Sequence, residues 1–220
     1  MGIYFFTILF LGATSAFCCP TGDFRAAEPQ DMLGADFENV WEVEKNSWVF
    51  DEETLSPLVT GEKRDLISNE VFENFVLTFD FFFTPGANSG IKYLIQDEYG
   101  NIGLEFQILD DFLHPDGQKG VERRLGSLYD LIPRQTRPIL KKNSFNTGCI
   151  IFKDRKGEHW LNGKKLLSYD LDSSSFKSAF AKSKFKSFSW FGSFHKGKIL
   201  IQHHGDLVYF RNMRIRSILP

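Results

Sequence analysis

The chain has 220 residues and a formal net charge of −2, so it is long enough for one domain with a full hydrophobic core. So small a net charge gives no strong attraction to nucleic acid; we expect no nucleic-acid partner, and nothing in the sequence implies a protein partner. The 24 Phe residues are an unusually large share, and many stand in alternating runs, which favours a β-rich core.

The N-terminus has the pattern of an export signal. Residues 3–13 form an apolar run that is too short to span a bilayer as a helix. Small residues follow at Thr14 and Ala16, as they do near the cleavage sites of secretory signals. Cys18 stands just after this run, where a bacterial lipoprotein carries its lipidated cysteine. We therefore expect an exported protein that is periplasmic, extracellular or lipid-anchored at the cell envelope, with Cys18 as the membrane tether.

These signals divide the chain into three parts. Residues 1–19 are expected to be a signal peptide or lipoprotein signal, residues 20–35 a polar linker, and residues 36–220 a single domain. Within that domain the one cysteine is Cys149, in an apolar, strand-like run. A lone cysteine supports no disulfide framework and no cysteine-based zinc site, so we expect a buried and inert thiol.

The domain reads as a series of short strands separated by turns, which predicts an all-β sandwich of two antiparallel sheets. One short helix is expected within residues 172–187, with its Lys and Ser residues on a solvated face. Asn162-Gly163 predicts a type I′ turn, and a bulge is expected at residues 210–212. The expected strands are residues 41–43, 48–50, 65–67, 75–83, 91–96, 102–109, 125–129, 148–152, 159–161, 164–168, 198–202 and 207–219.

The strands at 91–96 and 102–109 flank a polar turn and predict a hairpin. Side chains alternate along a strand, so Glu105 and Gln107 share one face of this hairpin. Lys92 joins that face if it pairs opposite Glu105. Two interpretations remain open for this polar face: a solvated sheet surface, or a ligand site on the concave side of a curved sheet.

The sequence contains no G-x-S-x-G, H-E-x-x-H or P-loop motif, which leaves serine hydrolases of the elbow type, zincins and P-loop enzymes without support. What remains is a set of carboxylates and histidines, crowded after the hairpin at Asp110, Asp111 and His114. Such donors suit a divalent metal such as zinc, manganese or cobalt. Glu105 and Asp110 could also be the acid–base pair of a glycosidase, although their opposite parity counts against it.

A set of motifs in this order resembles the 3-keto-disaccharide hydrolase domain family, long catalogued as a domain of unknown function. Residues 143–146 depart from the Gly-Glu-Trp-Asn that the family usually has there, and His203 stands where the family often has Asp. The motifs are NSGIKY at 88–93, LEFQILDD at 104–111 with HPD at 114–116, GSLYD at 126–130, EHWLNG at 158–163, SKFK at 183–186, IQHHGD at 201–206 and FRN at 210–212.

The resemblance implies a concanavalin A-like jelly roll and an exported enzyme that cleaves glycosides oxidised at C3. A ketone at C3 acidifies the proton on C2, so a base can remove it and the C1 oxygen can leave by elimination, with net hydrolysis when water adds back. The resemblance implies catalytic roles for Lys92, Glu105, His114 and His204, with Lys92 or a divalent metal stabilising the enolate and a histidine as base.

Further roles follow from the same resemblance. The metal ligands would be Glu105, Asp110 and His114, and the metal's identity is open. The substrate, an oxidised glycoside or disaccharide, would be bound by Asn88, Gln107, Asp111, His159, Gln202 and Arg211. The alternative from another class is a non-catalytic, lectin-like carbohydrate-binding module on the same scaffold.

Overall fold

The computed structural model describes residues 19, 24–44, 46–51 and 53–220. The apolar run at 3–13 and Cys18 lie outside these residues. Among the residues described, none of the helices combines the length and the apolar character that a membrane span requires.

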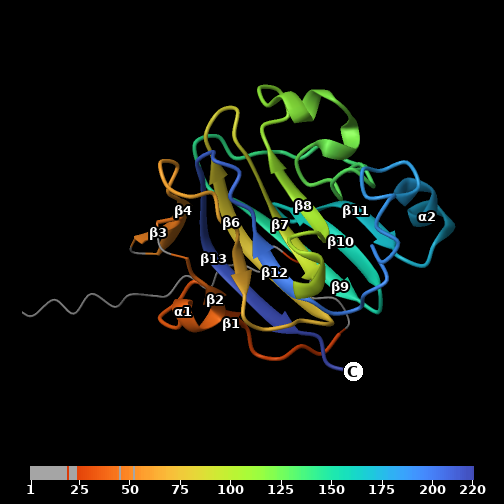
Figure 1. Ribbon diagram of the computed structural model, residues 1–220, viewed down its shortest axis with the longest axis horizontal. Helices are drawn as coiled ribbons and strands as arrows, with labels where there is room; N and C mark the ends of the chain where they lie inside the picture. The colour runs from red at the N-terminus through yellow and green to blue at the C-terminus, as the bar shows by residue number, and fades with distance from the viewer. Residues whose placement is uncertain (1–18, 20–23, 45, 52) are drawn as a thin grey trace, which may run out of the picture.

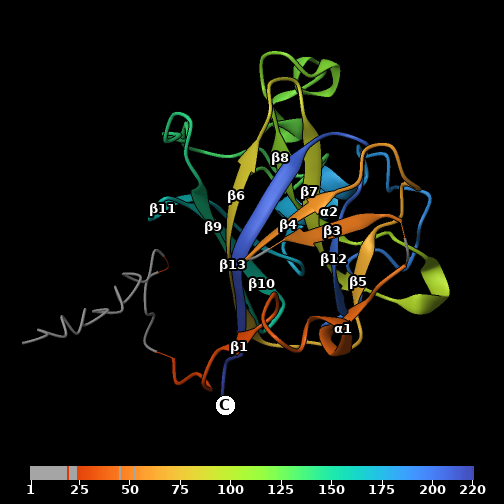
Figure 2. The same ribbon diagram turned by 90° about the vertical axis from the view of Figure 1, so that its left-hand side faces the viewer.

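Two antiparallel sheets pack face to face, as Figures 1 and 2 show. The larger has eight strands: β11 (Lys164–Asp170), β10 (Lys156–Leu161), β9 (Asn146–Lys153), β6 (Phe75–Phe83), β13 (Val208–Ser217), β4 (Thr54–Pro57) and β3 (Trp48–Asp51) in that order, with β1 (Gln30–Asp31) also paired to β13. The smaller has the order β2 (Trp41–Glu42), β5 (Leu66–Ser68), β12 (Lys198–Ile201), β7 (Asn88–Ile95) and β8 (Leu104–Leu109).

The core between the sheets is built from the alternating residues that the sequence predicts. On β6, Phe75, Phe79 and Phe81 are fully buried, and the ring of Phe79 lies 5.4 Å from that of Phe106 on β8 in an edge-on arrangement. Side chains of one parity therefore join the two sheets, and those of the other parity face outward.

The central hairpin has the register that would bring its polar residues together. Lys92 pairs directly with Glu105, and Gly90 with Gln107. The turn contains a short 3-10 helix, η1 (Asp97–Tyr99). Because Ile91 and Phe106 face the core, the side chains of Lys92, Glu105 and Gln107 project from the outer face of the five-stranded sheet.

Several local predictions are confirmed. Asn162 and Gly163 have φ values of 49° and 78°, as a type I′ turn requires. The pairing of β13 with β6 shifts between Arg211 and Arg214, where the bulge is expected. The helix is α2 (Ser174–Phe180), short as predicted, with the side chain of Ser173 accepting a hydrogen bond from the amide of Phe176 at 3.1 Å.

Two segments differ from their expected form. Residues 125–129 form no regular strand; Leu128 makes only isolated bridges to Phe106 and Ile132. Part of the expected linker belongs to the domain, because β1 pairs with β13 and Met32 is buried in the core. Its carbonyl accepts a hydrogen bond from the indole of Trp41 at 2.6 Å. α1 (Phe37–Val40) follows.

Cys149 is not a free thiol. It forms a disulfide with Cys19, 130 residues earlier in the chain. The prediction of a free thiol is wrong because its partner, Cys19, stands in the segment that the sequence assigns to the export signal. Val76, Cys149 and Ile151 have outward parity on the eight-stranded sheet, so the disulfide lies on the face of the sandwich opposite the polar residues of the hairpin.

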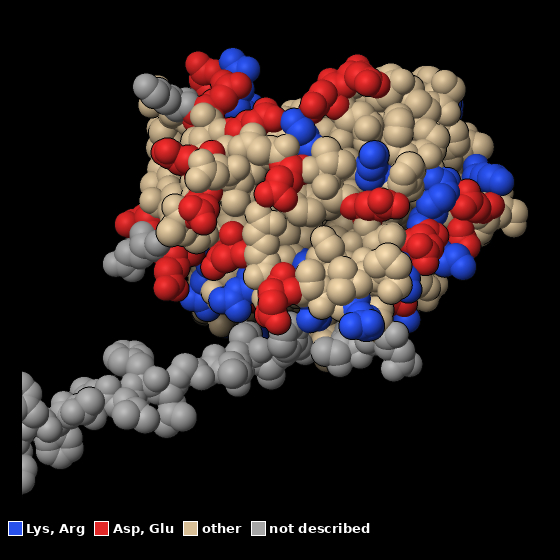
Figure 3. Space-filling model, turned by 90° about the horizontal axis from the view of Figure 1, so that it is seen from below, with Lys and Arg blue, Asp and Glu red and all other residues tan. Residues whose placement is uncertain are grey.

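Charged side chains of both signs lie on the surface of the sandwich. Figure 3 shows one face, seen from below, on which acidic and basic side chains are interspersed. This mixture agrees with the small net charge of −2 and gives that face no extended area of a single sign.

Candidate active site

A cavity of about 290 Å³ lies over the outer face of the five-stranded sheet. Its floor comes from the central hairpin and the end of β12. Two loops form its walls, one carrying Tyr129 and the other carrying Lys184, Phe185 and Phe188. The remaining lining residues are Asn88, Lys92, Asn101, Ile102, Gly103, Glu105, Gln107, Gln202 and His204.

Glu105 is at the centre of the floor. Its side chain is 4% exposed, and it lies over Gly90 so closely that a Cβ at Gly90 would overlap Oε1. Burial raises the pKa of Glu105, and the positive charges of Lys92 and Lys184 oppose that rise. A carboxyl group with a raised pKa in a pocket is suited to proton transfer near neutral pH.

Gln107 holds this carboxylate in place. With its amide nitrogen turned toward Glu105, as its hydrogen-bond partners require, Gln107 donates to Oε1 of Glu105 at 2.9 Å and to the carbonyl of Ser89 at 3.0 Å. The hydroxyl of Ser89 in turn donates to the carbonyl of Gln202 at 2.8 Å. These bonds join β7, β8 and β12 beneath the cavity, which makes the floor rigid.

Two lysines enter the cavity from different parts of the chain. Lys92 donates to the carbonyl of Asn101 at 3.1 Å. Lys184 places its ammonium group 4.2 Å from the ring centre of Tyr129. Burial lowers the pKa of Lys184, and the negative charge of Glu105 offsets part of that effect. Lys184 is exposed, as predicted for the lysines of residues 172–187, yet it also lines the cavity.

Tyr129 is fixed from behind by a polar network. Its hydroxyl donates to Oδ2 of Asp116 at 2.7 Å, and Arg123 donates to Oδ1 of the same carboxylate at 2.8 Å. Burial alone would raise the pKa of Asp116, but hydrogen bonds from Tyr129, Arg123 and Lys119 outweigh it and lower the pKa to about 2. Asp116 is therefore ionised at neutral pH and acts as a support for the wall of the cavity.

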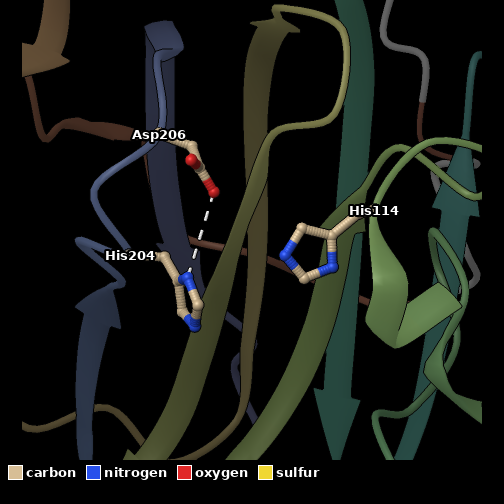
Figure 4. Close-up of side chains that lie close together, drawn as sticks. All are labelled: His114, His204 and Asp206. Atoms are coloured by element: carbon tan, nitrogen blue, oxygen red, sulfur yellow. Dashed lines mark ion pairs between the residues drawn. The ribbon is translucent and has the colours of Figure 1, made fainter.

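His204 lies at the polar end of the cavity, near His114 and Asp206 (Figure 4). The rings of the two histidines are 6.0 Å apart, and Nδ1 of His204 is 3.9 Å from Oδ2 of Asp206. Burial lowers the pKa of His204, while Asp206 raises it in part. At neutral pH the imidazole of His204 is therefore mostly uncharged and can accept a proton or bind a metal.

His114, His204 and Asp206 could hold a metal ion together, because one ligand atom from each lies within 4.8 Å of the other two. Among the residues that the structure describes, this is the group of histidine, cysteine and acidic side chains that meets that condition. Two imidazoles and a carboxylate fit a divalent ion such as zinc, manganese or cobalt. One hydrogen bond opposes metal binding: Nδ1 of His114 accepts a hydrogen bond from the backbone amide of Asp116 at 3.1 Å. An imidazole that binds a metal through Nε2 carries its proton on Nδ1, so His114 would lose this hydrogen bond when it binds the ion.

The three metal ligands expected from the sequence, Glu105, Asp110 and His114, do not form a group of neighbouring ligand atoms. Both carboxylate oxygens of Asp110 accept backbone amides, Oδ2 from Gly86 and Oδ1 from Phe112 and Leu113, at 3.0 to 3.1 Å. Burial would raise the pKa of Asp110, but these bonds outweigh it and lower that pKa. Asp110 shapes the loop that presents His114, and Asp206 stands in its place beside the two histidines.

Three expected substrate-binding residues lie away from the cavity. His159 is fully buried and contacts the hydroxyl of Tyr93 at 2.9 Å; burial lowers its pKa to about 4. Arg211 is on the opposite face of the sandwich, 3.7 Å from Asp80. Asp111 pairs with Arg134 at 2.7 Å. These expectations are corrected, since none of the three side chains reaches the cavity.

The expected residues Asn88, Gln107 and Gln202 all line the cavity with Lys92, Glu105 and His204. Sequence reasoning missed the contributions of Gly90, Tyr129, Lys184 and the two phenylalanines. Tyr129 and Lys184 stand within two of the motifs that carry the family resemblance. Their place in these motifs is the feature of the sequence that could have identified them as site residues.

Comparison with known proteins shows the family of the chain. The family model described as the 3-keto-alpha-glucoside-1,2-lyase-like domain matches residues 28–216. A protein of Bacteroides thetaiotaomicron named 3-keto-disaccharide hydrolase is 31% identical over 203 residues, covering 81% of this chain and 70% of that protein.

Solved structures give the same fold. A protein of Parabacteroides distasonis, named provisionally as a glycosyl hydrolase, superposes with a TM-score of 0.75 at 25% identity, covering 86% of this chain and 93% of that one. A second from the same organism gives a TM-score of 0.71 at 24% identity, covering 87% and 100%. A Bacillus subtilis protein with a galectin-like fold gives 0.51 at 13% identity, covering 88% and 96%.

The two stacked antiparallel sheets are thus a concanavalin A-like jelly roll. The family model matches the chain from the segment before β1 to the end of β13. The protein therefore belongs to the 3-keto-alpha-glucoside-1,2-lyase-like domain family.

Proposed function

We propose that this protein is an exported carbohydrate-active enzyme that cleaves 3-keto-glycosides by removing the proton from C2. The observation that carries the proposal is the position of Glu105: a buried carboxylate held by Gln107 on the floor of a polar cavity, under the influence of the positive charges of Lys92 and Lys184. The naming of the relative as a 3-keto-disaccharide hydrolase supports the same class of substrate.

In the proposed reaction Glu105 is the base. It takes the C2 proton, and the electron pair of the C2–H bond forms the C2–C3 double bond while negative charge moves onto the C3 oxygen. Lys92 and Lys184 stabilise that oxygen, because positive charges in a partly desolvated site act most strongly where charge develops. The enolate then expels the C1 oxygen, and water adding to C1 gives net hydrolysis.

Sequence reasoning assigned the base to His114 or His204. The geometry favours Glu105 for this role, because the carboxylate is on the floor of the cavity near both lysines, while His204 is at one end and His114 is not part of the lining. His204, Asn88 and Gln202 would bind sugar hydroxyls. A divalent ion held by His114, His204 and Asp206 would supply Lewis-acid polarisation when bound.

The disulfide between Cys19 and Cys149 supports export, because structural disulfides persist mainly in oxidising compartments. Cys18 stays the proposed lipid attachment point, immediately before the bonded Cys19.

The test uses the purified mature chain, a 3-keto-glucoside and the same glucoside without the ketone. We expect release of the leaving group from the keto substrate alone, and exchange of the C2 proton with solvent deuterium. Glu105→Gln should suppress both. Sugar binding without release from either substrate would contradict the proposal and favour the lectin-like module.

A further inference from the structure

The cavity has two chemically different ends. Its length follows strands β7 and β8, whose register places Lys92 and Glu105 between Asn88 on one side and the hairpin turn on the other. The Asn88 end is polar, with Gln202 and His204 beside it. The turn end is lined by Ile102, Gly103 and Phe188, with Phe185 from the same loop as Phe188.

The apolar end is a preformed wall. Phe185 is buried and stacks on Phe191 with ring centres 4.3 Å apart. Phe188 packs against Trp190 at 5.5 Å, and Trp190 stacks on Tyr99 at 4.3 Å. Tyr99 belongs to η1 in the hairpin turn, so this stack fastens the loop of Phe188 to the sheet. The wall therefore needs little ordering when a ligand binds.

A sugar would find few hydrogen-bond partners at this end. The polar groups there are Asn101 and the ammonium group of Lys92. The side-chain nitrogen of Asn101 donates to Asp65 at 2.9 Å, and its main-chain carbonyl accepts from Lys92 at 3.1 Å. Sugar hydroxyls placed against Ile102 and Phe188 would lose their water without replacement, which is costly. A flat apolar ring would gain from the same burial.

We infer that the wall of Ile102, Phe185 and Phe188 binds the leaving group of the substrate, and that this chain prefers 3-keto-glycosides with aromatic aglycones over 3-keto-disaccharides. The inference rests on the proposed function, since it names the substrate class of the same cavity. The keto sugar then occupies the polar end, and the C1–O bond to be broken lies beside Glu105.

The chemistry at this end agrees with that choice. Of the residues lining the cavity, those around Ile102 and Phe188 include no histidine and no second carboxylic acid, so the proton donors to a departing oxygen are Glu105, once it holds the C2 proton, and the ammonium group of Lys92. A phenol leaves readily as its phenolate: the enolate electrons form the C1–C2 double bond, the C1–O pair goes to the phenolate oxygen, and solvent later supplies its proton. An aromatic aglycone thus leaves without depending on either donor.

The experiment compares kcat/KM for phenyl, methyl and glucosyl 3-keto-glucosides of one anomeric configuration in the wild type and in Phe188→Ala. Taking the mutant-to-wild-type ratio for each substrate cancels the intrinsic difference between leaving groups. We expect a loss of about tenfold for the phenyl substrate, from the apolar area no longer covered, and less than about twofold for the methyl substrate.

Ile102→Ala is the second variant, in case Phe188→Ala fails to fold, and it should show the same selectivity. Phe112→Ala is the matched control: Phe112 is 73% exposed and lies outside the cavity, so all three ratios should stay near one. Equal losses for the three substrates, or a larger loss for the glucosyl substrate, would overturn the inference. Absence of cleavage for all 3-keto substrates in the wild type would instead overturn the proposed function.

Discussion

Gly90 leaves the space that the carboxylate of Glu105 occupies. The two residues lie on neighbouring strands of the hairpin, and a Cβ at Gly90 would overlap Oε1 of Glu105. The neighbouring group is the far end of a flexible side chain, so the carboxylate can move aside while the strands stay paired. Gly90 is thus required for the position of a functional group more than for the fold.

This relationship predicts separate effects on activity and stability for Gly90→Ala. Activity toward a 3-keto-glucoside should fall by about 100-fold, because a displacement of about 1 Å costs that much in a preorganised site. The melting temperature should change little. Activity assays and thermal unfolding monitored by circular dichroism test both. Retention of full activity by the folded variant would show that the position of Glu105 does not matter.

Glu105 should carry a stability cost that depends on pH. Burial raises the pKa of Glu105 in the folded state, whereas the unfolded value is about 4.3. The folded state therefore favours the protonated carboxyl, and its contribution to stability is lost as pH rises through the folded pKa. Relative to Glu105→Gln, the wild type should lose free energy of unfolding between pH 4 and neutral pH. Urea unfolding at several pH values measures this; a difference that is independent of pH would contradict it.

Lys184 should be needed for turnover. Lys184→Ala removes one of the two cations near Glu105, and we expect kcat to fall by about 100-fold, as for the loss of one oxyanion donor. Lys184→Arg should keep part of the kcat that Lys184→Ala loses, because the positive charge is retained. Lys186→Ala is the matched control on the same loop, since Lys186 is exposed and lies outside the cavity. Comparable losses in both alanine variants would rule out a specific role for Lys184.

Metal binding distinguishes the two candidate ligand sets. Asp206→Asn and His204→Ala should weaken the affinity for manganese, cobalt or zinc by at least about tenfold, as for ligand changes at other metal sites. Asp110→Asn should weaken that affinity much less, because Asp110 is not in the group whose ligand atoms lie within 4.8 Å of one another and acts only through the loop that presents His114. Isothermal titration calorimetry with each metal gives the affinities. A loss in the Asp110 variant as large as in the Asp206 variant would favour the set expected from the sequence.

Breaking the disulfide should lower stability and spare activity. Cys19 and Cys149 are 130 residues apart, and removing a crosslink over so long a loop typically costs about 2–4 kcal/mol. Cys149→Ser should unfold at lower denaturant concentration yet keep its kcat, because Cys149 is on the face opposite the cavity. A large loss of activity at temperatures where the variant is folded would contradict this separation.

The sequence predicted the hairpin and its polar face because strand periodicity fixes which side chains share a face. Lys92 opposite Glu105 follows from that rule and is confirmed. The same rule could have removed His159 from the site, since His159 shares its parity with the buried Leu161. The family resemblance points to the motif at 158–163 as a whole and does not separate its inward side chains from its outward ones.

The walls of the cavity could not be predicted in this way. Lys184 and Phe188 lie in an irregular segment after α2, where no repeat relates one side chain to the next. Their positions depend on stacking between residues far apart in sequence, such as Tyr99 with Trp190. The disulfide was missed for a similar reason, because half of it comes from a segment that resembles a signal.

The bond between Cys19 and Cys149 also sets the place where the N-terminal segment joins the sandwich. It joins the chain at residue 19 to the middle of β9, on the side of the sandwich away from the cavity. Whatever holds the segment before residue 19 therefore pulls on the back of the sandwich. A lipid at Cys18 would be one residue from this attachment, so the domain would rest with its back toward the bilayer and its cavity open to arriving glycosides.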